Sequence, residues 1–473
     1  MSSVEILPKN LDKTILKQPD GENLSYSELL ERSSKMTRLL QDLGLGVGSK
    51  ILIQADKNTD FIALYLASLL GGTTFIPINT SYTLEEISFL IKDSQPDLFI
   101  CQSKKINQIE ELTEVKVLSL DSDRTGTFQR QLENYSPNPS TVNIQKDDTA
   151  VILYTSGTTG KPKGAMLTYD NINSNLKDIQ KIWGLNEDDT LLHSLPLFHI
   201  HGLIIALTTA IHSGATILNL PKFEVESVRN NLPQSTVFMG VPTMYHRLSQ
   251  ILSSEDTKSM RLFVSGSAPL SENDFQAFKK TGHTILERYG MTETGVNLSN
   301  PLIGERRSGT VGLPLPNVEV KIDGEEVGEL LIKGPNVFSG YLNDTEKTKE
   351  SFTNGWFKTG DLASKDADGY YKIVGRIKEV IITAGLNVYP AEVEATLNNI
   401  PGVEESAVIG TPDEDLGEKV TAFIVQRPGS NLDEHSIRKA TWEYLAPYKR
   451  PSIIKIVNSL PRNAMGKVEK SKL

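Results

Sequence analysis

The stretch Thr155-Ser156-Gly157-Thr158-Thr159-Gly160-Lys161-Pro162-Lys163-Gly164 follows residues 150–154, an apolar run typical of a buried strand. Its glycines let the backbone approach a ligand and present N–H groups, and its hydroxyl and ammonium groups add further donors. This combination suits a polyphosphate. The order differs from that of a P-loop, because Pro162 rather than Ser or Thr follows Lys161. A polar loop between two strands is the alternative, and the stretch alone predicts only phosphate binding.

Length and composition narrow the class of protein. The 473 residues exceed what one hydrophobic core supports, so we expect two or more domains. The net charge of −10 argues against non-specific binding to nucleic acid or anionic membranes. Cys101 is the only cysteine, which excludes an internal disulfide and a cysteine-based metal site. The longest apolar runs, residues 61–70 and 203–211, are too short to span a bilayer, which takes ~20 residues.

Apolar periodicity predicts alternating strands and helices along most of the chain. Helices are expected at residues 25–45, 60–70, 84–93 and 204–211, and strands at 50–54, 73–76, 98–100, 191–196, 216–218, 237–240 and 262–266. This alternation predicts α/β layers with parallel strands. Residues 121–147 are polar and are expected to be a surface connection. From residue 309 short strands between Gly and Pro predict a small β-rich subdomain, and a boundary near residue 377 separates 1–377 from 378–473.

Three further motifs carry groups that suit a nucleotide. Glu287-Arg288-Tyr289-Gly290-Met291-Thr292-Glu293 offers an aromatic face, a hydroxyl and a carboxylate, which fit an adenine ring, a phosphate and Mg²⁺. In Trp356-Phe357-Lys358-Thr359-Gly360-Asp361 a carboxylate follows a tight turn and could bind two ribose hydroxyls. Pro461-Arg462-Asn463-Ala464-Met465-Gly466-Lys467 places a lysine near the C-terminus. Alone, each has a structural alternative: a packed tyrosine, a turn aspartate that caps a helix, and a solvated lysine.

Together the four motifs, in this order over residues 154–467, resemble the adenylate-forming superfamily of acyl-CoA synthetases, luciferases and adenylation domains. The resemblance implies an α/β fold with a large N-terminal ATP- and acid-binding domain and a small mobile C-terminal α/β domain. It implies that Tyr289 stacks on adenine, Thr292 contacts phosphate and Asp361 binds ribose beside Arg376. The whole predicted nucleotide site is Thr155, Ser156, Gly157, Thr158, Thr159, Gly160, Lys161, Gly266, Ser267, Ala268, Glu287, Arg288, Tyr289, Gly290, Met291, Thr292, Asp361, Arg376 and Lys467.

The resemblance also implies a two-step reaction that uses ATP, Mg²⁺ and CoA. A carboxylate first attacks the α-phosphate of ATP and releases pyrophosphate, and a thiol then displaces AMP. Lys467, Thr155 and Glu293 are the predicted catalytic residues, with Glu293 and Thr155 holding Mg²⁺. The family rotates its small domain between the steps, so Lys378 is the predicted hinge. Gly385, Leu386 and Asn387 are expected to line the CoA tunnel.

Basic residues near the motifs bear on which acid is used. Arginine pairs bidentately with carboxylates, and a buried Arg288 would disfavour an alkyl tail. The alternative is that Arg247 faces solvent and Arg288 pairs with Glu287. The surrounding stretches nevertheless resemble malonyl-CoA and methylmalonyl-CoA synthetases, as do 220–223, 266–269 and 334–338. The resemblance implies that Arg247, Arg288 and His201 bind the distal carboxylate of malonate. The predicted acid site is His199, His201, Gly240, Arg247, Ser265 and Arg288.

Several alternatives stay open at this point. The small residues Thr294-Gly295-Val296 leave open whether methylmalonate or a longer diacid fits. A general fatty or aromatic acyl-CoA ligase is the rival within the class, and a stand-alone adenylation module that loads a carrier protein is the rival outside it. The first residues lack a signal-peptide pattern, so we expect a cytoplasmic protein. The final Ser471-Lys472-Leu473 matches the peroxisomal address, although similar tails occur in the resembled family.

Overall fold

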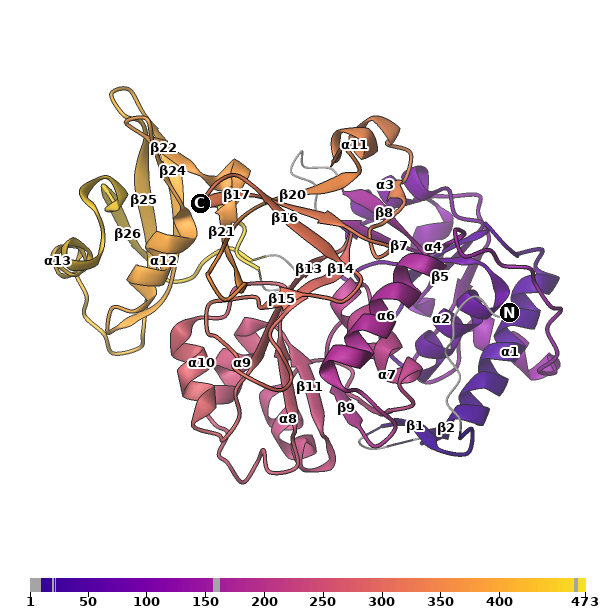
Figure 1. Ribbon diagram of the computed structural model, residues 1–473. Helices are drawn as coiled ribbons and strands as arrows, with labels where there is room; N and C mark the ends of the chain where they lie inside the picture. The colour runs from indigo at the N-terminus through magenta and orange to yellow at the C-terminus, as the bar shows by residue number, and fades with distance from the viewer. Residues whose placement is uncertain (1–9, 19–20, 22, 156–161, 463–466) are drawn as a thin grey trace.

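The computed structural model describes residues 10–18, 21, 23–155, 162–462 and 467–473, and in this part of the chain the strands form four sheets (Figure 1). The first sheet has the order β18-β8-β7-β4-β3-β5-β6, with β3 to β7 parallel where they pair. Its strands are β3 (Lys50–Gln54), β4 (Thr74–Pro77), β5 (Leu98–Cys101), β6 (Val117–Ser119), β7 (Thr149–Thr155), β8 (Lys163–Thr168) and β18 (Gly340–Tyr341).

The second sheet has nine strands in the order β15-β14-β13-β12-β11-β9-β10-β1-β2, with parallel pairing from β10 through β13. Its strands are β1 (Thr14–Lys17), β2 (Leu24–Ser25), β9 (Thr190–His193), β10 (Thr216–Asn219), β11 (Val237–Gly240), β12 (Leu262–Ser265), β13 (Leu286–Met291), β14 (Gly295–Ser299) and β15 (Leu313–Pro314). The carboxyl ends of β9, β11 and β12 therefore share one edge, where open α/β sheets place their ligands.

Helix α2 (Thr59–Gly71) is part of the core that the two sheets share. Nearly all of its side chains are buried, which is expected of a helix that is apolar on every face. Its first turn is capped by Asn58, whose side chain accepts from Phe61 N at 2.8 Å. The other helices are α1 (Tyr26–Asp42), α3 (Leu84–Ser94), α4 (Ile106–Glu110), α5 (Thr127–Gln131), α6 (Tyr169–Trp183), α7 (Thr209–His212), α8 (Val225–Asn231), α9 (Pro242–Ser249) and α10 (Glu272–Lys279).

Two smaller sheets follow. The β-rich sheet contains β16 (Glu319–Asp323), β17 (Val327–Lys333), β19 (Phe352–Thr353), β20 (Trp356–Lys365) and β21 (Tyr371–Arg376), with α11 (Thr345–Glu350) beside it. The C-terminal sheet contains β22 (Ile381–Thr383), β23 (Leu386–Val388), β24 (Val403–Asp413), β25 (Gly417–Gln426) and β26 (Ile453–Val457), with α12 (Pro390–Asn398) and α13 (Glu434–Tyr444). The C-terminal sheet has its own hydrophobic core and lies at one end of the molecule, as Figure 1 shows.

The predicted α/β class, β-rich subdomain and C-terminal α/β domain are confirmed. The boundary at residues 377 and 378 stays a prediction. The helix expected at 204–211 is wrong in detail, because a π-helix, η3 (His201–Thr208), precedes the short α7. No helix among the described residues is long and apolar enough to cross a membrane.

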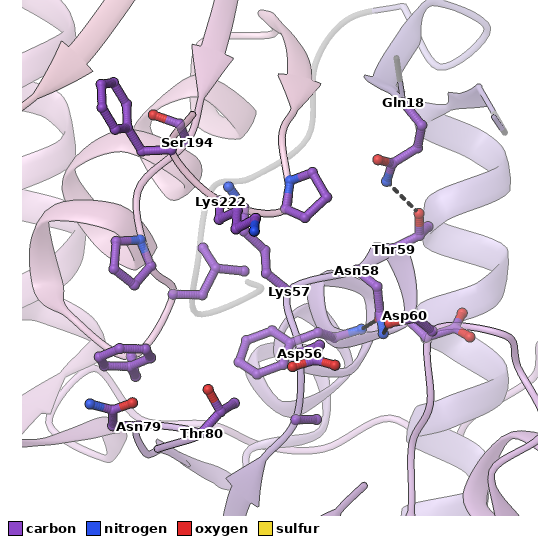
Figure 2. Close-up of a pocket in the computed structure, with 18 of the residues that line it drawn as sticks. Gln18, Asp56, Lys57, Asn58, Thr59, Asp60, Asn79, Thr80, Ser194 and Lys222 are labelled. Atoms are coloured by element: carbon purple, nitrogen blue, oxygen red, sulfur yellow. Dashed lines mark hydrogen bonds between the residues drawn. The ribbon is translucent and has the colours of Figure 1, made fainter. Parts of the chain in front are cut away.

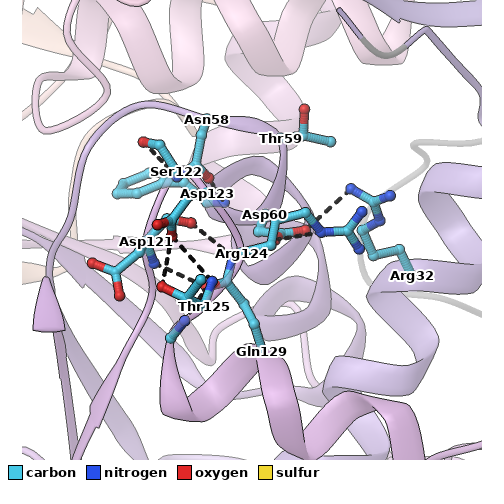
Figure 3. A network of polar contacts seen from close by, with 12 residues as sticks. Arg32, Asn58, Thr59, Asp60, Asp121, Ser122, Asp123, Arg124, Thr125 and Gln129 are labelled. Atoms are coloured by element: carbon cyan, nitrogen blue, oxygen red, sulfur yellow. Dashed lines mark hydrogen bonds and ion pairs between the residues drawn. The ribbon is translucent and has the colours of Figure 1, made fainter.

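The polar segment 121–147 is more structured than a surface connection. It contains α5 and the 3₁₀ turn η2 (Leu132–Asn134). Figure 3 shows how this segment is tied to the buried Asp60 of α2. Arg124 Nε lies 3.5 Å from one oxygen of Asp60, Gln129 donates to the same oxygen, and Arg32 of α1 donates to the other at 3.1 Å. The sequence prediction missed these contacts because the partners are far apart in the chain.

Candidate functional site

The predicted ribose-binding carboxylate is held in a fixed orientation by two donors. The Tyr289 hydroxyl donates to one oxygen of Asp361 at 2.6 Å, and Arg376 Nε lies 2.9 Å from the other. Asp361 and Arg376 face each other across the antiparallel pair β20–β21. The structure thus brings together three residues from separate motifs, at positions 289, 361 and 376.

Lys467 of the C-terminal domain joins this group. Its pKa is lowered, first by removal from water and then by the Arg376 guanidinium, whereas Asp361 and Glu379 act in the opposite direction. The Lys467 ammonium is therefore within electrostatic reach of Asp361 and Arg376, which are predicted to bind the ribose. The ammonium group of a lysine can interact with both a carboxylate and a phosphate, which suits the predicted role of Lys467.

Glu293 is the predicted metal ligand and is buried. Its carboxylate accepts from the Tyr341 hydroxyl at 2.9 Å, and burial raises the pKa of the group. A divalent cation would relieve the cost of that buried negative charge. No cluster of three or more His, Cys, Asp or Glu ligands occurs among the described residues, and Mg²⁺ needs none, because it is often held by one or two carboxylates together with substrate phosphates. Sequence analysis missed Tyr341, which no motif marks.

The signature stretch lies between two antiparallel strands. Thr155 ends β7 and pairs with Lys163 at the start of β8, so both ends of the stretch are fixed on the first sheet. Residues 156–161, which include six of the predicted phosphate-binding positions, lie outside the described residues. Lys163 Nζ lies 5.6 Å from the centre of the Tyr341 ring, which connects this hairpin to the Glu293 side of the site.

Arg288 lies against the second sheet and is only 4% exposed. Its guanidinium lies directly above Gly266, where a Cβ would collide with it. Among the described residues no partner hydrogen-bonds its Nε or Nη2, and burial lowers its pKa to about 10. The predicted alternative, an ion pair with Glu287, does not form. Glu287 instead accepts from Gly309 N at 3.2 Å, and burial raises its pKa to about 8.

Three further side chains of the predicted acid site are buried with polar atoms that lack a described partner: His199 Nε2, His201 Nε2 and Ser265 Oγ. His201 Nδ1 lies 3.3 Å from Ser267 Oγ, so Ser267 contacts the acid site. Burial lowers the pKa of His199 to about 4, and burial followed by Arg288 lowers that of His201, which favours neutral rings. The loop and π-helix that carry both histidines begin at the carboxyl end of β9.

One prediction about the acid site needs correction. Arg247 is exposed on α9, so the predicted alternative holds and the structure does not bring it to Arg288. Tyr245 and Leu248 occupy the buried face of that helix instead. Gly295 has φ +61°, and a Cβ there would collide with the Asn175 side chain. The small residue therefore meets a backbone requirement beside α6.

Comparison with known proteins agrees with this arrangement. The family model for AMP-binding enzymes matches residues 6–342, and that for their C-terminal domain matches residues 392–467. The chain belongs to the AMP-binding enzyme family. A malonate–CoA ligase of Arabidopsis thaliana is 35% identical, over 96% of this chain and 84% of the relative. The structure of ATP-bound MatB from Rhodopseudomonas palustris is 40% identical, covers 100% of this chain and 98% of its own, and has a TM-score of 0.97.

This AMP-binding enzyme superposes more closely on the ATP-bound structure of MatB than on the apo structure. Apo MatB, at the same identity and coverage, gives a TM-score of 0.87. The predicted CoA-tunnel residues lie elsewhere: Gly385 (φ +77°) is in the turn between β22 and β23, and Leu386 and Asn387 are exposed.

A cavity of about 820 Å³ is lined in part by residues 194 and 196–198, which precede the predicted acid-site histidines (Figure 2). One wall is apolar and includes Phe198, whose ring centre lies 4.5 Å from that of His199. The other wall includes Lys57, whose ammonium lies 2.5 Å from His193 Nδ1 and whose pKa is lowered by burial. His193 Nε2 lies 2.9 Å from the carbonyl of Gly202, so the cavity wall also supports the loop that carries His199 and His201.

Proposed function

We propose that this AMP-binding enzyme is a malonate–CoA ligase, which forms malonyl-adenylate from malonate and ATP and then malonyl-CoA from CoA. The observation that carries the proposal is the set of buried polar atoms without described partners around Arg288. Five atoms belong to it: Nε and Nη2 of Arg288, Nε2 of His199, Nε2 of His201 and Oγ of Ser265. Buried polar groups are normally hydrogen-bonded, so a set of unsatisfied ones marks a ligand site.

The chemistry of the set favours an anion. With a pKa of about 10, Arg288 remains a cation at neutral pH, and a buried cation without a counter-charge is costly. A carboxylate would accept two parallel N–H bonds from its guanidinium. An alkyl or aromatic tail would leave the guanidinium unpaired, which disfavours a general fatty or aromatic acid.

The relatives favour a short diacid. Arg288 and Tyr289 are consecutive residues of β13, so their side chains leave opposite faces of the strand. Arg288 lies against Gly266, whereas Tyr289 hydrogen-bonds Asp361. One strand therefore carries both the residue proposed to bind the distal carboxylate and a residue proposed to bind the nucleotide. Malonate has one carbon between its carboxylates, and the malonate–CoA ligases among the relatives support it as the acid. Methylmalonate differs by one methyl group and is the closest rival.

The protein groups near the nucleotide supply the charge that two anionic reactants need. Lys467 would meet the attacking carboxylate and the α-phosphate, while Asp361 fixes the ribose. Mg²⁺ held by Glu293, Thr155 and the phosphates of ATP would neutralise charge on the leaving pyrophosphate. In such transfers the enzyme contributes chiefly positioning and electrostatic stabilisation. Rotation at Lys378 would then bring the Gly385 turn to the adenylate for attack by CoA, in the cytoplasm.

A substrate panel tests the acid. Pyrophosphate release should be measured with malonate, methylmalonate, succinate, acetate and hexanoate, with and without CoA. We expect kcat/KM for malonate to exceed that for acetate by roughly a hundred-fold or more, because a buried charge pair contributes a few kcal/mol. A preference for hexanoate would contradict the diacid assignment. A preference for methylmalonate would keep the class of acid and change the substrate.

A second prediction concerns the hinge. Lys378 is exposed in the 3₁₀ turn η5 (Ile377–Glu379), which joins β21 to β22. Proline at position 378 fixes one backbone dihedral and should restrict rotation. We expect Lys378→Pro to reduce CoA-thioester formation by about ten-fold or more while adenylate formation persists. Lys378→Ala should retain both steps. Equal loss of both steps in the proline variant, with the fold intact, would contradict the hinge role.

A further inference from the structure

A histidine joins the N-terminal and C-terminal domains. His246 on α9 has Nδ1 2.8 Å from Asp274 Oδ1 of α10, within its own domain. Its Nε2 lies 3.0 Å from Glu404 Oε1 of β24, in the C-terminal domain. Asn273 of α10 donates to the carbonyl of Asn398 at 3.0 Å, which is a second contact between the domains. This interface forms while Lys467 lies beside Asp361 and Arg376.

The His246 ring can hydrogen-bond both carboxylates only in one protonation state. Carboxylates accept hydrogen bonds, whereas a neutral imidazole carries one N–H and one lone pair. Only an imidazolium donates to Asp274 and Glu404 together. When the ring is neutral, one carboxylate faces a lone pair and the contact becomes repulsive. Both carboxylates are partly exposed, with 16% and 33% of their side-chain surfaces accessible.

The surrounding charges favour the imidazolium. Arg427, after β25, has Nε 3.8 Å from the second oxygen of Glu404 and stabilises its negative charge. On the neighbouring α8, Arg229 pairs with Asp256. Arg247, the next residue on α9, is exposed. The pKa of His246 is raised, first by the hydrogen bond with Asp274 and then, against burial, by both carboxylates.

We propose that protonated His246 is a positioning residue that links Asp274 to Glu404 and so holds the C-terminal domain where Lys467 reaches the nucleotide. The link forms with proton uptake when the domain docks, and the proton is released when the domain leaves for the CoA step. The proposal rests on the proposed two-step reaction for its consequence. The docking itself can be measured without any substrate.

The direction of the pH effect follows from linkage. Docking brings Glu404 to the ring, so the docked state has a higher His246 pKa than the undocked state. The link stabilises the docked state fully below about pH 6.5, the ordinary pKa of histidine. This stabilisation is lost as the pH rises through the raised pKa of His246. Alkaline pH should therefore favour the undocked domain.

The first test measures adenylation alone, as malonate-dependent ATP–pyrophosphate exchange from about pH 6 to about pH 9. We expect His246→Gln to lower the exchange rate roughly five-fold at the acid end and little at the alkaline end, where the wild type has lost the link. Glu404→Gln should keep the contact without a proton, because an amide can donate to or accept from the ring. As the pH rises, the exchange rate of Glu404→Gln should not show the fall that depends on His246. It should change only with the ionisation of Lys467.

Two variants on the exposed face of α13 provide matched controls, namely His435→Gln and Glu443→Gln, and both should follow the wild-type profile. A constant ratio of His246→Gln to wild type across the pH range would overturn the proposal. So would a Glu404→Gln profile that matches the wild type.

The second test measures domain position with no substrate present. Spin labels at Lys349→Cys on α11 and Lys439→Cys on α13, in a Cys101→Ser background, report the distance between the domains. The docked population should fall from about pH 6 to about pH 8.5 in the wild type and stay constant in Glu404→Gln. A wild-type distribution that does not change with pH would overturn the link, whichever acid the enzyme uses.

Discussion

Replacement of Lys467 by alanine should abolish adenylate formation and spare the attack of CoA on added acyl-adenylate. Adenylation brings two anions together, and the ammonium of Lys467, beside Asp361 and Arg376, is positioned to stabilise the charge that develops. Loss of one preorganised donor typically costs ~3 kcal/mol, or about a hundred-fold in rate. Removal of the whole positive charge of Lys467 should lower the rate by more than this factor. Pyrophosphate exchange measures the first step and CoA consumption with added adenylate measures the second.

The control for this prediction is Lys472→Ala, near the same end of the chain. Lys472 pairs with Glu469 and lies outside the nucleotide group. We expect it to leave both steps unchanged. If Lys467→Ala lost both steps equally while its thermal unfolding matched the wild type, Lys467 would not be specific to adenylation. The CoA step should proceed without it because the proposed rotation at Lys378 would replace the Lys467 face with the Gly385 turn.

The elements with strong periodicity were predictable from sequence. The apolar run of α2 and the short parallel strands β3, β4, β5 and β11 need only local patterns, since burial on both sides makes them continuously hydrophobic. The π-helix at His201 was not predictable, because its widened turn has the same composition as an α-helix. The contacts of Asp60 with Arg124 and Gln129 join residues more than sixty positions apart and leave no local signal.

The site was predictable where a motif fixes a residue and less so where packing decides. Tyr289, Asp361 and Arg376 lie together in the structure, and their roles and that of Lys467 stay predictions. For Arg247, function and a solvent-facing position were about equally plausible from chemistry, and the structure places it on the exposed face of α9, whereas Arg288 is buried on β13. Tyr341 and the His246–Glu404 contact depend on tertiary structure alone.

Arg288→Ala should lower kcat/KM for malonate by about 10²–10³-fold and change that for acetate by less than about three-fold. Removal of one partner of a buried charge pair typically costs about 2–5 kcal/mol. Acetate should be little affected, because it has no second carboxylate to pair with Arg288. The matched control is Arg247→Ala, the other candidate arginine, which is exposed on α9 and should leave both values nearly unchanged. Comparable losses in the two variants would extend the acid site to α9. An equal loss of kcat/KM for malonate and for acetate would mean that Arg288 does not determine substrate specificity.

Stability gives this prediction a second, independent measurement. Without substrate, Arg288 is a buried cation with two donors that no described residue satisfies, which is a cost to the free enzyme. Arg288→Met fills the space without the charge, so the thermal midpoint of the free protein should stay constant or rise. Malonate should raise the midpoint of the wild type and not that of the variant, because ligand stabilisation scales with binding to the native state. A midpoint that falls sharply in Arg288→Met would mean that the guanidinium has a structural partner, and the specificity argument would lose its physical basis.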